Sequence, residues 1–361
     1  AALQIRKKVL GEEHADVATC YNNVGNVLQE QGKLDEAMEK YEAALQIFKK
    51  VDECANVAMC YNSMGNVLST QGKLNEAMEM HEAALQIRKK VLGEEHADVA
   101  RSYNNMGVVL EEQGQPDEAM EKFEAALLIN RKVYGEEHVD VAMCYNNMGC
   151  VLKEQGKLDA AMEKYDAALQ IKKKVLGEEH ADVASCYNNM GNVLKAQSRH
   201  GEAMEKYEAA LQIKKKVFGA DSADYSIALL RAADSACATK SSLDDSHFFT
   251  ELNRIVAVDA QLLDSVAPSE LAFGLRSHVG LLRLAARFGQ RASDTTALEQ
   301  WRANVQRLID NAHPVVRALG LQELANVRDD GRFARATACE SECLLAALRA
   351  SASPCALREA T

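Results

Sequence analysis

Asparagine side chains recur in pairs along roughly the first half of the chain, and each pair follows a tyrosine. An amide side chain carries both a donor and an acceptor, which matches the two hydrogen-bonding groups of a peptide bond. Asn is a mediocre helix former, so its repeated use at one helical position needs a reason other than helix stability. We therefore predict that these amides hold the backbone of an extended peptide. The alternative is architectural, with the amides bonding one another and the neighbouring backbone.

The amides form two rows, because equivalent positions of stacked repeats line up. The first Asn ladder comprises Asn22, Asn62, Asn104, Asn146 and Asn188. The second Asn ladder comprises Asn23, Ser63, Asn105, Asn147 and Asn189. One helical turn further along the same face lie Asn26, Asn66 and Asn192, which extend the predicted polar stripe.

Charged residues flank the ladders less regularly and give one end of the stripe its own electrostatic character. Arg101, Lys153 and Lys195 make that end basic, while Glu112 and Glu154 offset part of the charge. The predicted peptide-binding groove consists of the ladder asparagines, the three further asparagines and these three cations. It includes no catalytic or metal-binding residue.

Histidines recur in Gly-Glu-Glu-His connectors, at His14, His96, His138 and His180, which suggests a metal hypothesis. One His per repeat, displaced by a helix-pair spacing of about 10 Å, does not converge on one ion with bonds near about 2.0 Å. We interpret these histidines as helix starts.

Motifs of known catalytic chemistry do not occur in the sequence. It contains no phosphate-binding loop, dinucleotide fingerprint, nucleophile elbow or zinc-protease motif. Cys339 and Cys343 would share a helical face, but no His or second Cys pair stands near them. We predict a protein without enzymatic activity and without a cofactor.

The composition excludes further classes of function. The net charge is -11 for 361 residues, and an acidic surface offers no attraction to nucleic acid or to an anionic membrane. No apolar run approaches the roughly 18 residues that span a bilayer. Ten Cys without paired spacing are typical of reduced thiols, so we predict a soluble cytoplasmic protein.

The elements that must position the amides form a repeat. The tyrosines before the pairs, Tyr21, Tyr61, Tyr103, Tyr145 and Tyr187, are 40, 42, 42 and 42 residues apart, a period typical of solenoids. Within each period, apolar residues at spacings of three and four predict two helices. We predict full repeats starting near residues 15, 55, 97, 139 and 181, after a half repeat at 1–10.

These positions carry a family resemblance. Tyr21, Val24, Gly25, Leu28, Ala37, Tyr41 and Ala44 match the slots of the tetratricopeptide repeat (TPR), and the Gly-Glu-Glu-His extension resembles the long repeat of kinesin light chains. The resemblance covers roughly residues 1–235. It implies an all-α, right-handed superhelix of antiparallel helix pairs whose first helices line a concave groove. In kinesin light chains that groove accepts cargo-adaptor peptides.

The repeat pattern decays towards residue 235. We predict a degenerate capping helix at 223–238, a linker at 236–247, a small helical module of unknown role at 248–350 and a disordered tail at 351–361. All 12 Met and all 10 Tyr lie at or before Tyr225, whereas the single Trp, Trp301, follows it, which supports two modules. Because Ala1–Ile5 repeats Ala43–Ile47, the chain begins within a helix, and we interpret it as a fragment or an incomplete gene model.

The sequence thus predicts a non-catalytic scaffold or adaptor that binds an extended segment of a partner protein. The alternative is a regulatory or sensor fragment of a larger switch protein whose enzymatic domain lies outside this chain. A third hypothesis places an enzyme within residues 240–361. The sequence names neither the partner nor the oligomeric state.

Overall fold

The computed structural model describes residues 2–219 together with residues 225, 228, 231 and 232. The chain divides into two units, Ala1–Glu178 and Glu179–Thr361, and each is described by itself. The predicted linker, helical module and tail lie outside the described residues. Of the predicted capping helix, the described residues Tyr225, Ala228, Arg231 and Ala232 are helical.

The described residues form helices and turns without a strand, and their order confirms the predicted all-α fold of consecutive helix pairs. In the first unit α1 (Ala2–Leu10) precedes four helix pairs. These are α2 (Ala15–Glu30) with α3 (Leu34–Lys50), α4 (Cys54–Thr70) with α5 (Leu74–Leu92), α6 (Ala97–Glu112) with α7 (Pro116–Tyr134), and α8 (Val139–Glu154) with α9 (Leu158–Leu176). The second unit begins with a fifth pair, α10 (Ala181–Ala196) and α11 (His200–Phe218).

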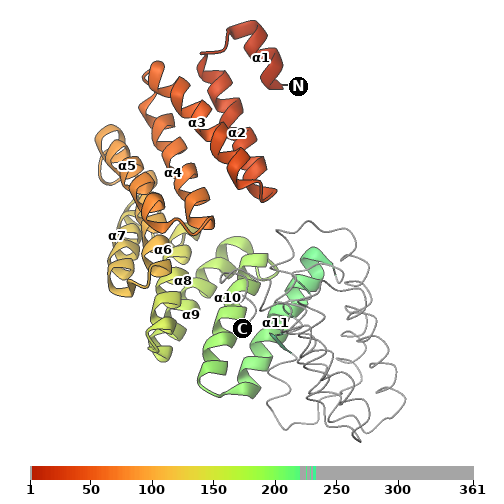
Figure 1. The fold of residues 1–361 in the computed structure, drawn as a ribbon. Coiled ribbons are helices and arrows are strands. Elements are labelled where there is room, and N and C mark those ends of the chain that lie inside the picture. Colours follow the sequence, from red (N-terminus) through yellow and green to blue (C-terminus); the bar gives the residue numbers. More distant parts are fainter. Residues whose placement is uncertain (1, 220–224, 226–227, 229–230, 233–361) are drawn as a thin grey trace, which may run out of the picture. The chain divides into compact units, whose positions relative to one another are not determined.

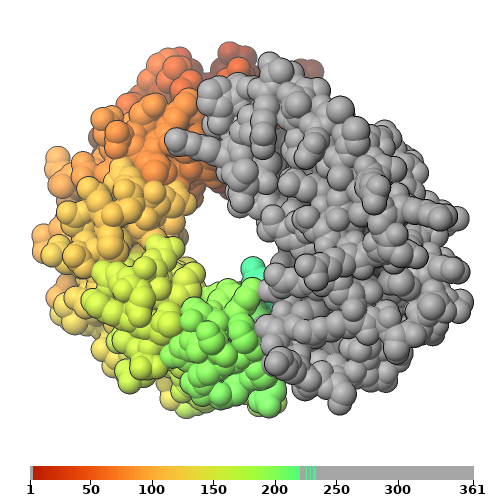
Figure 2. All heavy atoms as spheres, turned by 60° about the horizontal axis from the view of Figure 1, so that its bottom comes forward, coloured from red at the N-terminus to blue at the C-terminus, as the bar shows by residue number. Residues whose placement is uncertain are grey.

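Stacking of the pairs curves the first unit. Each second helix packs against its own first helix and the next one, as α5 does with α4 and α6. First helices also contact each other, α2 with α4, α4 with α6 and α6 with α8. In Figure 1 the pairs of this unit follow an arc, with α4 and α6 towards its inner side and α5 and α7 towards its outer side. Figure 2 shows the same arc, from red to yellow, hollowed on its inner side.

Glycine and proline residues mark the ends and the starts of helices. Gly32 has a φ of 73°, and its N–H donates to the Gln29 carbonyl while that of Lys33 donates to the Leu28 carbonyl, both at 2.9 Å. Gly is favoured at this left-handed position because it lacks a Cβ. Pro116 lies in the first turn of α7, where a missing N–H removes no helical hydrogen bond.

Histidine starts four of the first helices, which confirms the interpretation of the Gly-Glu-Glu-His connectors. The Nδ1 atom of His96 accepts the backbone N–H of Asp98 at 3.1 Å. His14, His138 and His180 make the equivalent bond at 3.1, 3.2 and 3.1 Å. A side-chain acceptor at this position satisfies one of the free N–H groups of a helix start.

Glycine and an aromatic ring set the distance between the helices of a pair. A Cβ on Gly25 would lie 2.6 Å from Cε1 of Tyr41, closer than carbon atoms approach. The other pairs place Gly65 against His81, Gly107 against Phe123, Gly149 against Tyr165 and Gly191 against Tyr207. The rings are buried, so the absent side chain creates the space that the ring fills.

Candidate functional site

The first Asn ladder lies largely inside the stack. Asn22, Asn104 and Asn188 are 3%, 6% and 3% exposed, whereas Asn62 and Asn146 are half-buried. A buried side chain does not reach a ligand on the surface. The most buried members of the predicted site are therefore placed to support their neighbours, as in the architectural alternative.

Amide hydrogen bonds link the first helices of successive repeats. Asn147 on α8 donates from Nδ2 to Oδ1 of Asn104 on α6 at 2.8 Å. Asn105 on α6 donates from Nδ2 to Oδ1 of Asn62 on α4 at 3.0 Å, and to Oδ1 of Asn66 at 3.3 Å. Each bond runs from an Asn of the second ladder to an Asn of the preceding repeat. The Nδ2 groups of Asn105 and Asn147 are therefore occupied within the array.

Two of the further asparagines are held by the core rings. The Tyr41 hydroxyl donates to Oδ1 of Asn26 at 2.8 Å, and the Tyr207 hydroxyl donates to Oδ1 of Asn192 at the same distance. In the fourth repeat Cys150 takes the Asn position, and Tyr165 donates to its Sγ at 3.3 Å.

The third repeat shows why this position varies. Its ring is Phe123, which has no hydroxyl, and Val108 stands where the other repeats have Asn or Cys. In the first, third, fourth and fifth repeats the inner residue therefore matches the hydrogen-bonding capacity of the ring beside it.

Several predicted residues do face solvent. Asn23, Asn26, Arg101 and Lys195 are exposed. The half-buried members are Asn62, Asn66, Asn105, Asn146, Asn147, Lys153, Asn189 and Asn192. Neither Asn23 nor the Oδ1 atom of Asn105 forms a hydrogen bond within the described part of the chain. These groups are open to a ligand.

The basic end of the predicted surface also holds an acidic group with altered chemistry. Burial, and then the charge of Glu154, raise the pKa of Glu111 to about 7, with Lys153 opposing and Glu112 adding to the shift. Successive repeats carry Glu111 and Lys153 at the same helical position. The net charge at this place changes near neutral pH, because Glu111 loses its proton there.

One buried position in the second helices was not predicted from the sequence. It is occupied by Phe48, Arg88, Asn130, Lys172 and Lys214, all 9% exposed or less. Lys172 and Lys214 are thus buried, although Lys is rarely buried in proteins. Phe48 was the available clue, since an aromatic residue in a repeated position indicates that the position is buried.

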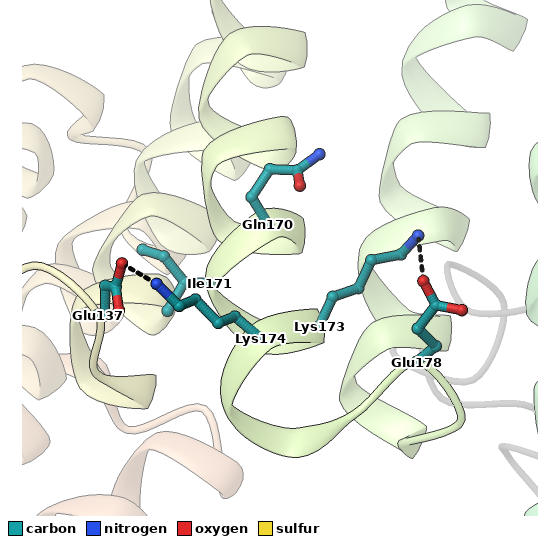
Figure 3. Close-up of a pocket in the computed structure, with 6 residues that line it drawn as sticks. All are labelled: Glu137, Gln170, Ile171, Lys173, Lys174 and Glu178. Carbon is teal, nitrogen blue, oxygen red and sulfur yellow. Dashed lines mark hydrogen bonds and ion pairs between the residues drawn. The ribbon is translucent and has the colours of Figure 1, made fainter.

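An open surface pocket lies beside α9, and two ion pairs are among its lining (Figure 3). Lys174 reaches Glu137 of the preceding connector, and Lys173 lies 3.7 Å from Glu178. Because each charge drawn here has a partner of opposite sign, the pocket offers a ligand little unsatisfied charge.

The described residues contain no group of three or more His, Cys, Asp or Glu side chains placed to hold a metal ion. Burial raises the pKa of Cys60 to about 12 and that of Cys144 to about 11. Thiols with raised pKa values are poor nucleophiles, because the reactive form is the thiolate. Among the described helices none is long and apolar enough to cross a membrane.

Comparison with known proteins accounts for the helix pairs. The family model of the tetratricopeptide repeat matches residues 1–50, 56–127, 115–174 and 152–216. The chain belongs to the tetratricopeptide repeat family. TPR arrays are protein-interaction scaffolds, generally without catalytic activity, and this chain shares that architecture. No curated protein matches the chain.

Solved structures resemble the TPR array in fold. BtubC (BKLC) from P. vanneervenii is 22% identical with a TM-score of 0.50, over 57% of this chain and 82% of its own. The apo form of RapI is 16% identical with a TM-score of 0.54, over 82% and 99%. The nearly identical TPR-like repeats of a predicted kinesin light chain from Podosopora anserina are 22% identical with a TM-score of 0.47, over 56% and 97%.

Proposed function

We propose that the TPR array is an adaptor that binds an extended segment of a partner protein along the first helices. The observation that carries this proposal is that the two Asn ladders differ in how far their amide groups are hydrogen-bonded within the array. Asn62 and Asn104 of the first ladder accept hydrogen bonds from the next repeat, whereas Asn23 and the Oδ1 atom of Asn105 keep hydrogen-bonding capacity that no described residue uses. Asn23 and Asn105 occupy one repeated position, and their unused amide groups suit the repeated groups of a peptide backbone.

Variation beside the ladders supports a role in selecting the partner. A variable row lies two residues before the repeated tyrosine of each first helix. It consists of Thr19, Met59, Arg101, Met143 and Ser185. A row of recurring amides next to a row of variable residues suits a surface on which the amides bind the backbone of a peptide and the variable residues select its side chains. The kinesin light chain resemblance points to the same class of adaptor function.

A peptide selection tests the proposal. The full chain is immobilised, 12-residue peptides are selected from a phage-displayed random library, and the affinity of synthetic copies is measured by fluorescence polarisation. Asn23→Ala and Arg101→Met each remove one ligand contact, and Met is the residue that two other repeats carry at the second position. We expect each change to weaken binding about three- to tenfold, equivalent to about 0.5–1.5 kcal/mol.

Lys90→Met provides the matched control, because Lys90 is an exposed cation on the second helix α5. It changes the net charge as Arg101→Met does and should leave peptide affinity unchanged. Failure to enrich any peptide, or equal affinities for the wild type and both inner-face variants, would contradict the proposal.

A further inference from the structure

Arg88 on α5 is a buried cation. The residue is 3% exposed, at the position that Phe48 and Asn130 occupy in neighbouring repeats. A buried charge is costly unless it is paired and hydrogen-bonded. Its surroundings should therefore contain a counter-charge or a place for one.

The described residues satisfy only one of its nitrogens. Nη1 donates to Oγ of Ser102 at 2.7 Å, to the Asp98 carbonyl at 3.1 Å and to Oδ1 of Asn62 at 3.3 Å. Within the described chain, Nε and Nη2 donate to no acceptor, and no carboxylate forms an ion pair with Arg88. The nearby Asp98 carboxylate is bound to Arg101 at 2.6 Å.

A cavity of about 160 Å³ is lined in part by Arg88. Arg88 and Arg101 line it together with Asp98, and Met59 of α4 and Ile87 of α5 are among its apolar residues. A water molecule occupies about 30 Å³ in the liquid, so the cavity has room for a small side-chain group. We call it the Arg88 pocket.

The charges around the Arg88 pocket favour an anion. Burial, and then the charge of Arg101, lower the pKa of Arg88 to about 10, while Asp98 opposes the shift. The guanidinium is therefore still protonated at neutral pH. Of the charged groups that line the pocket, two are cations and one is an anion, which leaves a single positive charge for a ligand to balance.

We propose that the Arg88 pocket receives an Asp or Glu side chain of the partner segment. The proposal rests on the proposed function and adds the chemistry of one partner residue. A carboxylate accepts two parallel hydrogen bonds from a guanidinium edge, and Nε and Nη2 form such an edge. Its single charge matches the pocket, and its methylene groups suit the Met59 and Ile87 walls.

The position of the pocket connects it to the predicted groove. Met59 and Arg101 belong to the variable row beside the Asn ladders, and both line the pocket. A segment that follows the first helices therefore passes the opening. Among the described repeats, only the third has Arg in the variable row, Arg101, together with Arg at the buried position of the preceding second helix, Arg88.

The first test uses a capped amino acid and needs no selected peptide. The Tm of the full chain is measured with N-acetylglutamate amide and with N-acetylglutamine amide, at matched ionic strength. We expect the carboxylate to raise the Tm of the wild type, and to raise that of Arg88→Asn by less than half as much. Asn is the residue that α7 carries at the equivalent position, Asn130, so the variant should fold.

Lys90→Asn is the charge-matched control, since Lys90 is exposed on the same helix; it should respond as the wild type does. Equal Tm shifts in the wild type and Arg88→Asn, or no shift in the wild type, would overturn the proposal. Arg88→Lys serves as a second variant, because Lys172 and Lys214 occupy this position elsewhere. It keeps the charge without the planar edge and should respond less than the wild type.

The second test uses the selected peptides. Changing an Asp or Glu of the peptide to Asn or Gln should weaken its binding to the wild type about tenfold and to Arg88→Asn less than twofold. An equal loss of peptide affinity for the wild type and for Arg88→Asn would show that the acidic residue of the peptide binds outside the Arg88 pocket, which would contradict the proposal. If no peptide is selected, the adaptor function fails, while the Tm comparison still decides whether the Arg88 pocket binds a carboxylate.

Discussion

At several positions of this TPR array, the residue type depends on the side chain that it contacts. Tyr41 and Tyr207 face Asn, whereas Phe123, which lacks a hydroxyl, faces Val108. The same dependence explains Arg88, whose Nη1 bonds Ser102, while Asn130 in the equivalent position donates to Sγ of Cys144 at 3.6 Å. Buried polar groups need partners, so such positions change together.

Glu111 gives a prediction at this scale. Its carboxyl has a pKa of about 7 in the folded state against an ordinary value of 4.5, so folding favours the protonated form. Its stabilising contribution is present below pH 4.5 and is lost as the pH rises through 7. Glu111→Gln should therefore raise the free energy of unfolding at pH 8 by about 1 kcal/mol, since solvent screening reduces the full effect.

Urea unfolding followed by circular dichroism at pH 5 and pH 8 measures this difference. The variant should gain stability at pH 8 and little at pH 5. Glu118→Gln, at an exposed position of α7, controls for the loss of one acidic charge. A gain of the same size at both pH values would show that the Glu111 carboxyl is not the source.

Helix pairs are the elements of the array, and their separation depends on glycine. Phe123 and Tyr165 fill the space that Gly107 and Gly149 leave. Ala is the better helix former by about 1 kcal/mol, so glycine in mid-helix is retained against local preference. Packing between the two helices decides this position.

Gly149→Ala is the corresponding prediction. The new Cβ would lie 2.7 Å from Cε1 of Tyr165, a residue that is 1% exposed. Overpacking costs about 1–3 kcal/mol, which exceeds the gain in helix propensity. We expect a lower Tm and a net loss of about 1–2 kcal/mol by urea unfolding. Met143→Ala, at an exposed position of α8, should change stability far less; equal losses would refute the packing argument.

At the scale of the whole array, stability depends on contacts between repeats. Ion pairs span one repeat at the connectors, for example Lys50 with Glu13 and Lys132 with Glu95. These pairs are exposed, and exposed ion pairs contribute about 0–1 kcal/mol each. The partly buried amide bond between Asn147 and Asn104 should contribute more, because removing one partner leaves the other unsatisfied.

Asn104→Ala tests this coupling. The change removes the acceptor of the Asn147 amide inside the stack and should lower the free energy of unfolding by about 1–3 kcal/mol. Asn23→Ala, an exposed member of the second ladder, should alter it by less than about 0.5 kcal/mol. Thermal and urea unfolding of the two variants measure both values. If Asn104→Ala is as stable as Asn23→Ala, the first ladder does not hold the repeats together.

The sequence alone determined the repeat, its helix pairs and the turns between them. These features depend on residues close together in one period, such as Gly32 in the turn and His96 at the helix start, so local patterns predict them. The glycine-to-ring contact was also predictable, because a glycine and a ring-bearing residue recur at the Gly25 and Tyr41 positions in every full repeat.

Only the tertiary structure decided which members of a row reach solvent. Asn22 and Asn23 are adjacent in the sequence, yet one is buried and the other exposed, because the packing of one repeat on the next sets what each helix face meets. The Arg88 pocket has the same origin, since its walls come from α4, α5 and α6. A period of 42 residues fixes which positions are equivalent, whereas the contacts between repeats fix what each position can do.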